Sequence, residues 1–167
     1  MKIKKRYIGA VISVVLLLVG FLFVRGILIN RGKVALEEEN SAEAVNYLRP
    51  LVAIGDPEAE GLYGTMYSFG LGVKKDDQEA YNWYIKAGAT QAEAEYYVAE
   101  NNKFLFVRHK RAEDAAESLK WYIQSAGDKN PKAAAFLSKA YADGLLGLPR
   151  DEKQARYWSD LAKALKK

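Results

Sequence analysis

Cysteine is absent from this 167-residue chain, and histidine occurs once, at His109. The lack of cysteine excludes disulfides, thiol nucleophiles and cysteine ligands for a metal. One histidine leaves little from which to build a Ser-His-Asp triad or a His-rich metal site. We therefore expect no catalytic residues, no metal and no cofactor, and we expect that the protein is not an enzyme.

Carboxylates are plentiful, but their positions do not suggest catalysis. A glycosidase-type pair requires two carboxyl groups that face each other across a cleft. The carboxylates considered for such a pair are Glu37, Glu38, Glu39, Glu93, Glu95, Glu113 and Asp114. Most of them are expected at solvated helix positions or at helix caps instead.

The net charge of +4 has an uneven distribution. Seven of the 25 basic residues lie within the first 33 positions, and no acidic residue occurs before Glu37. From residue 34 onward, 18 basic residues stand against 21 acidic ones. The basicity therefore belongs to the N-terminus, and no nucleic-acid-binding surface is predicted.

Residues 7–24 form an uncharged run of 18 residues. Its one serine, Ser13, does not make a polar face such as a soluble core helix would show. As a helix the run would span roughly 27 Å, close to the thickness of a hydrocarbon core of about 30 Å. A cleaved signal peptide needs a small-x-small site after a short apolar region, whereas bulky Phe21, Leu22 and Phe23 end this run. We therefore predict an uncleaved transmembrane helix at 7–29, preceded by a cytoplasmic basic tail at 1–6.

The flanking charges predict an orientation. Four basic side chains and the amino terminus precede the run, whereas the three basic residues behind it are soon joined by the acidic residues 37–39. This bias favours a cytoplasmic N-terminus. The expected location is a bacterial inner membrane, crossed once, with the remainder of the chain in the periplasm.

Three later segments resemble one another. They begin at Asp76, Asp114 and Asp151, and in each a tryptophan follows the aspartate by seven residues: Trp83, Trp121 and Trp158. Small residues follow the same aspartates by four and by eleven positions. Each segment predicts a helix, with the aspartate capping its N-terminus.

The stretches ahead of the first and third segments also align. Gly64 and Tyr67 correspond to Ser138 and Tyr141. Gly70 and Gly72 match Gly144 and Gly147, and these glycines are predicted to supply positive φ at a corner between two helices. A phosphate-binding loop would require G-x-x-x-x-G-K-[ST] after a strand, which "GLGVKKDD" does not provide.

This pattern resembles the Sel-one-like repeat, a relative of the tetratricopeptide repeat. Residues 59–91 match it closely, residues 133–164 match with one extra corner residue, and residues 92–128 keep the second helix but lack the glycine corner. The resemblance implies an all-α fold: a short α-solenoid of helix-turn-helix repeats after one transmembrane helix. Three repeats are expected at about 57–91, 92–130 and 131–167. Residues 30–56 are expected to form a linker and a degenerate capping half-repeat, with Ser41 at the aspartate position and Leu48 at the tryptophan position.

The resemblance also implies a concave face that binds a protein. We expect tyrosines on that face: Tyr63, Tyr67, Tyr96, Tyr97 and Tyr141. Residues 102–111 have no glycine corner and are either a longer, packed helix or a projecting basic-aromatic corner. In the second case Phe104, Phe106, Arg108, His109 and Arg111 would reach the partner or an anionic surface.

Two functions fit this resemblance. Short anchored proteins of this kind include immunity proteins that neutralise envelope-directed toxins, among them phospholipase effectors of type VI secretion. Others are scaffolds or regulatory adaptors in cell-wall or polysaccharide assemblies. The partner expected in the first case is a secreted toxin.

Overall fold

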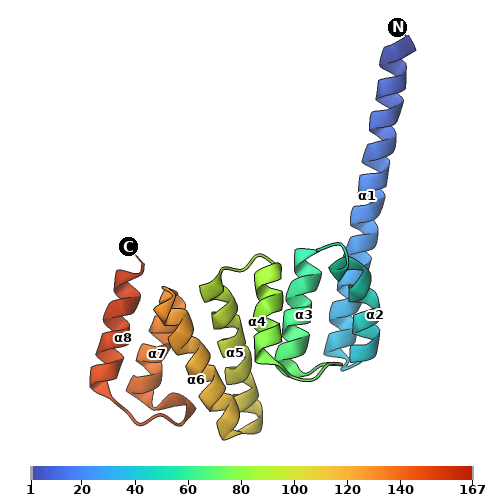
Figure 1. The fold of residues 1–167 in the computed structure, drawn as a ribbon. Coiled ribbons are helices and arrows are strands. Elements are labelled where there is room, and N and C mark those ends of the chain that lie inside the picture. Colours follow the sequence, from blue (N-terminus) through green and yellow to red (C-terminus); the bar gives the residue numbers. More distant parts are fainter. Residues whose placement is uncertain (1, 167) are drawn as a thin grey trace. The chain divides into compact units, whose positions relative to one another are not determined.

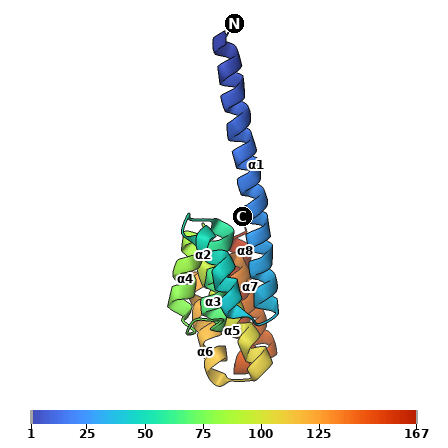
Figure 2. The same cartoon turned by 90° about the vertical axis from the view of Figure 1, so that its right-hand side faces the viewer.

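The computed structural model describes residues 2–166, and every regular element in that range is helical (Figures 1 and 2). The chain divides into two compact units, the first ending at Ala59 and the second beginning at Glu60. The predicted all-α fold is confirmed for these residues.

The first unit contains α1 (Lys2–Glu37) and α2 (Ser41–Val52). From Val11 to Val24 the large apolar side chains of α1 are about half to three-quarters exposed. Farther along, Ile29 and Ala35 are buried, and α2 contributes Ala44, Leu48 and Leu51 to the same small core. Figure 2 shows α2 beside the C-terminal part of α1. The helix is therefore bare where it is most apolar and packed where it meets α2.

This arrangement changes the expected organisation of residues 30–56. Residues 30–37 continue α1 instead of forming a linker, and Gly32 in this stretch lets Leu48 of α2 approach closely. A Cβ atom at Gly32 would lie 2.6 Å from Leu48 Cδ2. Asn40, rather than Ser41, caps α2, and its side chain accepts a hydrogen bond from the Glu43 backbone N–H.

Three helix pairs follow. They are α3 (Pro57–Phe69) with α4 (Asp77–Lys86), α5 (Gln91–His109) with α6 (Ala112–Gly127), and α7 (Pro131–Asp143) with α8 (Glu152–Ala164), the last two joined through a short 3₁₀ turn, η1 (Leu145–Gly147). Figure 1 shows α4 to α8 side by side in chain order. The sequential stacking of helix pairs is that of an α-solenoid.

The first and last corners have the predicted geometry. Gly70 and Gly72 have φ of 71° and 68°, and Gly144 and Gly147 have φ of 73° and 78°. Asp76 and Asp151 then cap α4 and α8, since each carboxylate accepts two backbone N–H groups of the first turn. The Asp76 backbone N–H donates to the Tyr67 carbonyl, as that of Asp151 does to the Tyr141 carbonyl.

The middle corner differs, and the predicted role of Asp114 is wrong. Arg111 occupies the N-cap of α6, and Asp114 lies inside the helix, where its carboxylate accepts from the Arg111 side chain at 2.8 and 3.1 Å. Lys110 takes the left-handed conformation that glycine takes in the other corners, with φ of 57°. Helix α5 consequently extends through most of the anomalous segment, to His109.

The three tryptophans are not equally buried, although they share one position of the repeat. Trp121 is buried, whereas Trp83 and Trp158 are half-buried. In the first two repeats the residue after the tryptophan is a buried tyrosine: Tyr84 is 7% exposed and Tyr122 is fully buried. Tyr122 stacks on Phe136 with ring centroids 4.0 Å apart. The more deeply buried member of the Trp-Tyr pair is thus the tyrosine in the first repeat, and both the tryptophan and the tyrosine are buried in the second.

Candidate functional site

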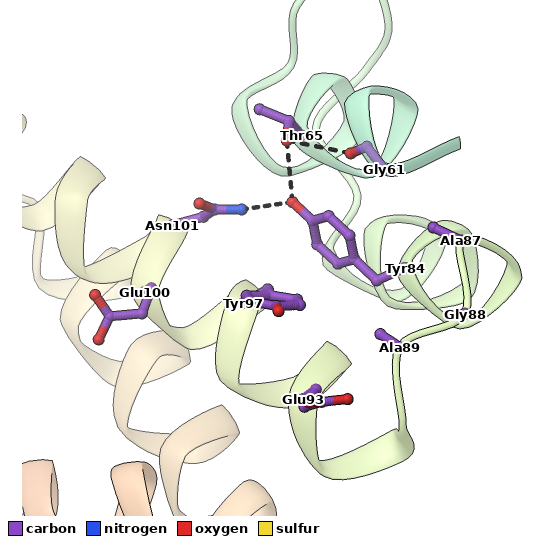
Figure 3. A pocket seen from close by; sticks show the side chains of 10 residues that line it. All are labelled: Gly61, Thr65, Tyr84, Ala87, Gly88, Ala89, Glu93, Tyr97, Glu100 and Asn101. Atoms are coloured by element: carbon purple, nitrogen blue, oxygen red, sulfur yellow. Dashed lines mark hydrogen bonds between the residues drawn. The ribbon is translucent and has the colours of Figure 1, made fainter. Parts of the chain in front are cut away.

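A cavity of about 500 Å³ opens between α3, α4 and α5 (Figure 3). Small residues form much of its wall, and they are Gly61 from α3 and Ala87, Gly88 and Ala89 from the turn after α4. The remaining lining side chains are Thr65, Tyr84, Glu93, Tyr97, Glu100 and Asn101. The cavity therefore has aromatic, amide, hydroxyl and carboxylate groups on a surface kept open by small residues.

Tyr84 connects the three helices at this cavity. Its hydroxyl lies 2.8 Å from Asn101 Nδ2 on α5 and 3.3 Å from Thr65 Oγ1 on α3 (Figure 3). Thr65 Oγ1 donates in turn to the Gly61 carbonyl at 3.3 Å. The Tyr84 ring fits because α3 has no side chain at Gly64, where a Cβ would lie 2.5 Å from Tyr84 Cε1.

One face of α5 lines the cavity. Glu93, Tyr97 and Asn101 follow one another at four-residue spacing, which places them on the same side of a helix. The ring of Tyr97 is 45% exposed and meets Tyr84 edge to face, with centroids 5.4 Å apart. Thr90 starts α5 with a capping box in which Glu93 Oε2 accepts from the Thr90 backbone N–H at 2.9 Å.

A second hollow of about 590 Å³ continues along α5 towards the start of α7. It shares Glu93 and Tyr97 with the first cavity and adds Tyr96, Asn130 and Lys132 among others. Tyr97 thus stands between the two hollows, and we call the joined surface the α5 groove.

Hydrogen bonds and burial set the electrostatics of the groove. Bonds from Thr90 hold the pKa of Glu93 below its usual range. Burial acts to raise the pKa of Glu100. Hydrogen bonds from Lys103 Nζ, 2.6 Å from Glu100 Oε2, and from the Tyr122 hydroxyl outweigh burial, and the pKa of Glu100 lies below its usual value. Both carboxylates are therefore ionised at neutral pH. Burial and the Glu100 charge raise the pKa of Tyr96 to about 12, so this phenol stays neutral.

Of the five predicted tyrosines, the structure brings Tyr96 and Tyr97 together in the α5 groove. The other three are half-buried and lie elsewhere. Tyr63 contacts Trp83 edge to face at 5.2 Å, and Tyr67 packs against the main core. Tyr141 accepts a hydrogen bond through its carbonyl at the last corner.

The residues predicted for a basic-aromatic corner form the end of α5 and the start of α6. Phe104 is 53% exposed and touches Phe69 edge to face at 5.7 Å, whereas Phe106 is half-buried. Arg108 and His109 are exposed, and Arg111 is paired with Asp114. The segment is thus a lengthened helix that also presents apolar and basic side chains to solvent.

Sequence reasoning missed several groove residues. Tyr84, Glu100, Asn101 and Thr65 were not selected, and Glu93 was treated only as surface or cap. The four-residue spacing of Glu93, Tyr97 and Asn101 was a usable signal, because it identifies one helix face. Glu95, expected at a solvated position, is instead fully buried.

Among the described residues, no group of three or more His, Cys, Asp or Glu side chains is arranged to hold a metal ion. The groove offers non-covalent contacts: π faces, hydrogen-bond acceptors and two carboxylates. These groups can recognise another molecule by non-covalent contacts.

Comparison with known families decides the class of the chain. The Sel1 repeat model matches residues 57–89, 92–128 and 131–166, which together exceed half of the sequence. The chain belongs to the Sel1 repeat family. The α5 groove runs along the second of these repeats, from the turn at the end of the first to the start of the third.

Two relatives illustrate the similarity. An uncharacterized protein of Neisseria meningitidis serogroup B is 33% identical over 114 residues, which are 68% of this chain and 23% of that protein. The crystal structure of a Sel1 repeat protein from Oxalobacter formigenes is 28% identical, with a TM-score of 0.42, and the match covers 83% of this chain and 56% of that one. The chain spans about a quarter and about half of these two proteins, respectively.

Proposed function

We propose that this Sel1 repeat protein is held in a bacterial inner membrane by α1 and binds a partner protein in the periplasm through the α5 groove. The exposed ring of Tyr97 carries this proposal, since it stands between two hollows and is backed by Tyr84 and Tyr96. Exposed aromatic side chains on a rigid support are typical binding anchors at protein interfaces.

The properties of α1 support the anchor. Among the described residues, α1 is the one helix that is long and apolar enough to cross a membrane. The large apolar side chains from Val11 to Val24 are exposed, so lipid is a suitable environment for them. Packing against protein begins near Ile29, which is 5% exposed.

A charge cluster marks the proposed end of the membrane span. Arg25 Nη2 donates to Asp56 Oδ1 and to Glu58 Oε2, both at 3.1 Å, and Lys33 Nζ donates to Glu58 Oε1 at 2.7 Å. These pairs neutralise the cations that follow the apolar run. They reduce the weight of Arg25 and Lys33 in setting the orientation, which leaves the N-terminal basic tail as the stronger determinant.

The topology can be tested with reporters fused after Lys167. An alkaline phosphatase fusion should be active, because this enzyme folds to its active form only in the periplasm. A green fluorescent protein fusion should be dark, because this protein becomes fluorescent in the cytoplasm but not after export by the general secretory route. The reverse pattern would place the repeats in the cytoplasm and reject this part of the proposal.

Binding can be tested by replacing Tyr97 with a photo-crosslinking phenylalanine analogue in the full chain, expressed in its own host. The matched control is Tyr157 on α8, which is 59% exposed and lies outside the α5 groove. We expect a discrete crosslinked protein from position 97 and none from 157. Equal crosslinking at both positions would argue against the α5 groove as the binding surface.

In its narrower form, we propose that the partner is an envelope-directed toxin, such as a phospholipase effector, which the repeats inhibit by binding. This form rests on the resemblance to anchored immunity proteins. Co-expression with a toxin encoded beside the gene, exported to the periplasm, should restore growth, and Tyr97→Ala should abolish that protection. A crosslinked partner from a wall or polysaccharide assembly would replace this narrower proposal with an envelope-scaffold role.

A further inference from the structure

The cavity between α3, α4 and α5 has an unusual balance of hydrogen-bonding groups. A chain of internal bonds occupies much of its donor capacity: Asn101 Nδ2 donates to the Tyr84 hydroxyl, which donates to Thr65 Oγ1, which donates to the Gly61 carbonyl. The amide Oδ1 of Asn101 remains as an acceptor. The wall therefore presents mainly acceptors to a ligand.

The charged groups on the cavity wall have one sign. Glu93 and Glu100 line it, and the lining contains no lysine or arginine. Both bonds from Thr90 to Glu93 go to Oε2, at 2.9 and 2.8 Å, so Oε1 retains its lone pairs. Glu100 is paired with Lys103, whereas Lys132 of the second hollow attracts Glu93 through space, so Glu93 is the principal negative group of this cavity.

Tyr97 adds an aromatic face between the two carboxylates. Figure 3 shows it on α5 between Glu93 and Glu100, next to the Tyr84 ring. A cation above an aromatic ring is attracted to its π face, and the attraction increases when water is partly excluded. The carboxylate of Glu93, one helical turn before Tyr97, can accept a charge-assisted hydrogen bond from the same cation.

These groups select the class of ligand. An anionic side chain would face two carboxylates, and a purely apolar one would bury Asn101 Oδ1 and Glu93 Oε1 without hydrogen bonds, which costs free energy. A long cationic side chain satisfies the acceptors with its head and covers the tyrosine rings with its aliphatic stem. A volume of about 500 Å³ admits such a side chain together with neighbouring backbone.

We propose that this cavity binds an arginine or lysine side chain of the partner protein, with Glu93 accepting its hydrogen bonds and Tyr97 contacting its stem and charge. This inference rests on the proposed protein-binding function and specifies the chemistry of the partner. The cation docks beside Ala87–Ala89 and reaches towards Asn101.

The test uses the full chain in neutral detergent micelles and the tripeptide acetyl-Gly-Arg-Gly-amide as the probe. Binding is followed by two-dimensional NMR of the backbone amides of residues 87–89, which line the cavity. We expect saturable shifts with the arginine peptide. The matched peptide with citrulline, which is uncharged but nearly isosteric, should bind about tenfold more weakly, because it lacks the charge-assisted bonds.

Variants locate the binding. Glu93→Gln should weaken it about tenfold, while the glutamine preserves the capping box at the start of α5. Tyr97→Ala should weaken it several-fold through loss of the cation–π contact. The matched controls are Glu79→Gln, an exposed carboxylate of α4 outside the cavity, and Tyr157→Ala; both should bind like the parent chain.

The outcomes separate this inference from the proposed function. Equal binding of the arginine and citrulline peptides, or binding unaffected by Glu93→Gln, would overturn cation recognition. If the peptide fails to bind but crosslinking from position 97 persists, the partner uses the α5 groove without a cation in this cavity, and only this inference falls. If both fail, the α5 groove is not the binding surface.

Discussion

Gly64 of α3 faces the ring of Tyr84 of α4 so closely that a Cβ atom at Gly64 would lie 2.5 Å from Tyr84 Cε1. The missing side chain lets the tyrosine cross between the helices and reach Thr65 and Asn101 with its hydroxyl. The first helix pair, its contact with the second pair and one wall of the cavity therefore depend on this glycine.

Gly64→Ala should destabilise the repeats by about 1–3 kcal/mol, since overpacking a filled site forces the ring or the backbone to move. Gly61→Ala is the matched control, because its Cβ would lie at an ordinary 3.9 Å from Ala87 Cβ. We expect the control to be neutral or slightly stabilising, as alanine is the better helix former. Urea denaturation followed by tryptophan fluorescence measures both, and equal midpoints would contradict the close packing.

Gly147→Ala should cost about 1–2 kcal/mol for a purely conformational reason. Its φ is 78°, a region disfavoured for side chains with a Cβ, whereas the space around it is open. Gly127→Ala, also in open space but without positive φ, is the control. Thermal unfolding should separate the two variants, and a destabilised Gly127→Ala alone would show that the backbone argument is misplaced.

Truncation of the three tryptophans should give unequal losses. Trp121→Ala should cost about 3–5 kcal/mol, because this side chain is 4% exposed and stacks on Tyr81 with centroids 5.8 Å apart. Trp83→Ala and Trp158→Ala should cost less, since both side chains are half-buried. Equal losses of stability in denaturant titrations of the three variants would mean that the three repeats bury their tryptophans equally.

Lowering the pH from 8 to 5 should stabilise the protein through Glu95. Burial raises the pKa of this fully buried carboxyl to about 7, and the nearby Asp128 charge adds to the effect. Between the unfolded value of about 4.3 and about 7 the folded state binds more protons than the unfolded state, so the contribution is complete at low pH and is lost as pH rises through about 7. It amounts to on the order of 3 kcal/mol.

Glu95→Gln isolates this effect. The amide cannot ionise, so the variant should gain stability at pH 8 and lose the Glu95 part of the pH dependence. Glu113→Gln, an exposed position on α6, should leave the profile unchanged. Parallel profiles for the parent chain and Glu95→Gln would show that Glu95 keeps its ordinary pKa in the folded protein.

The sequence by itself determined the all-α class, the repeat period, the first and last corners and the apolar segment of α1. These features depend on local chemistry: glycine where φ is positive, aspartate where backbone N–H groups need an acceptor, and an uncharged run where no polar face is present. Asp76, Asp151, Gly70 and Gly144 behave as predicted because each acts within a few residues of its own position.

Only the tertiary structure decided which aromatic and acidic side chains are buried and which line a surface. Tyr67 and Tyr97 both lie in helices, yet Tyr67 packs on the core and Tyr97 stands in the α5 groove, because neighbouring helices cover more of Tyr67. Glu93 and Glu95 are two residues apart and point to different sides of α5, one towards the cavity and one into the interior. Burial is set by the elements packed against a residue, and those contacts join positions far apart in the chain.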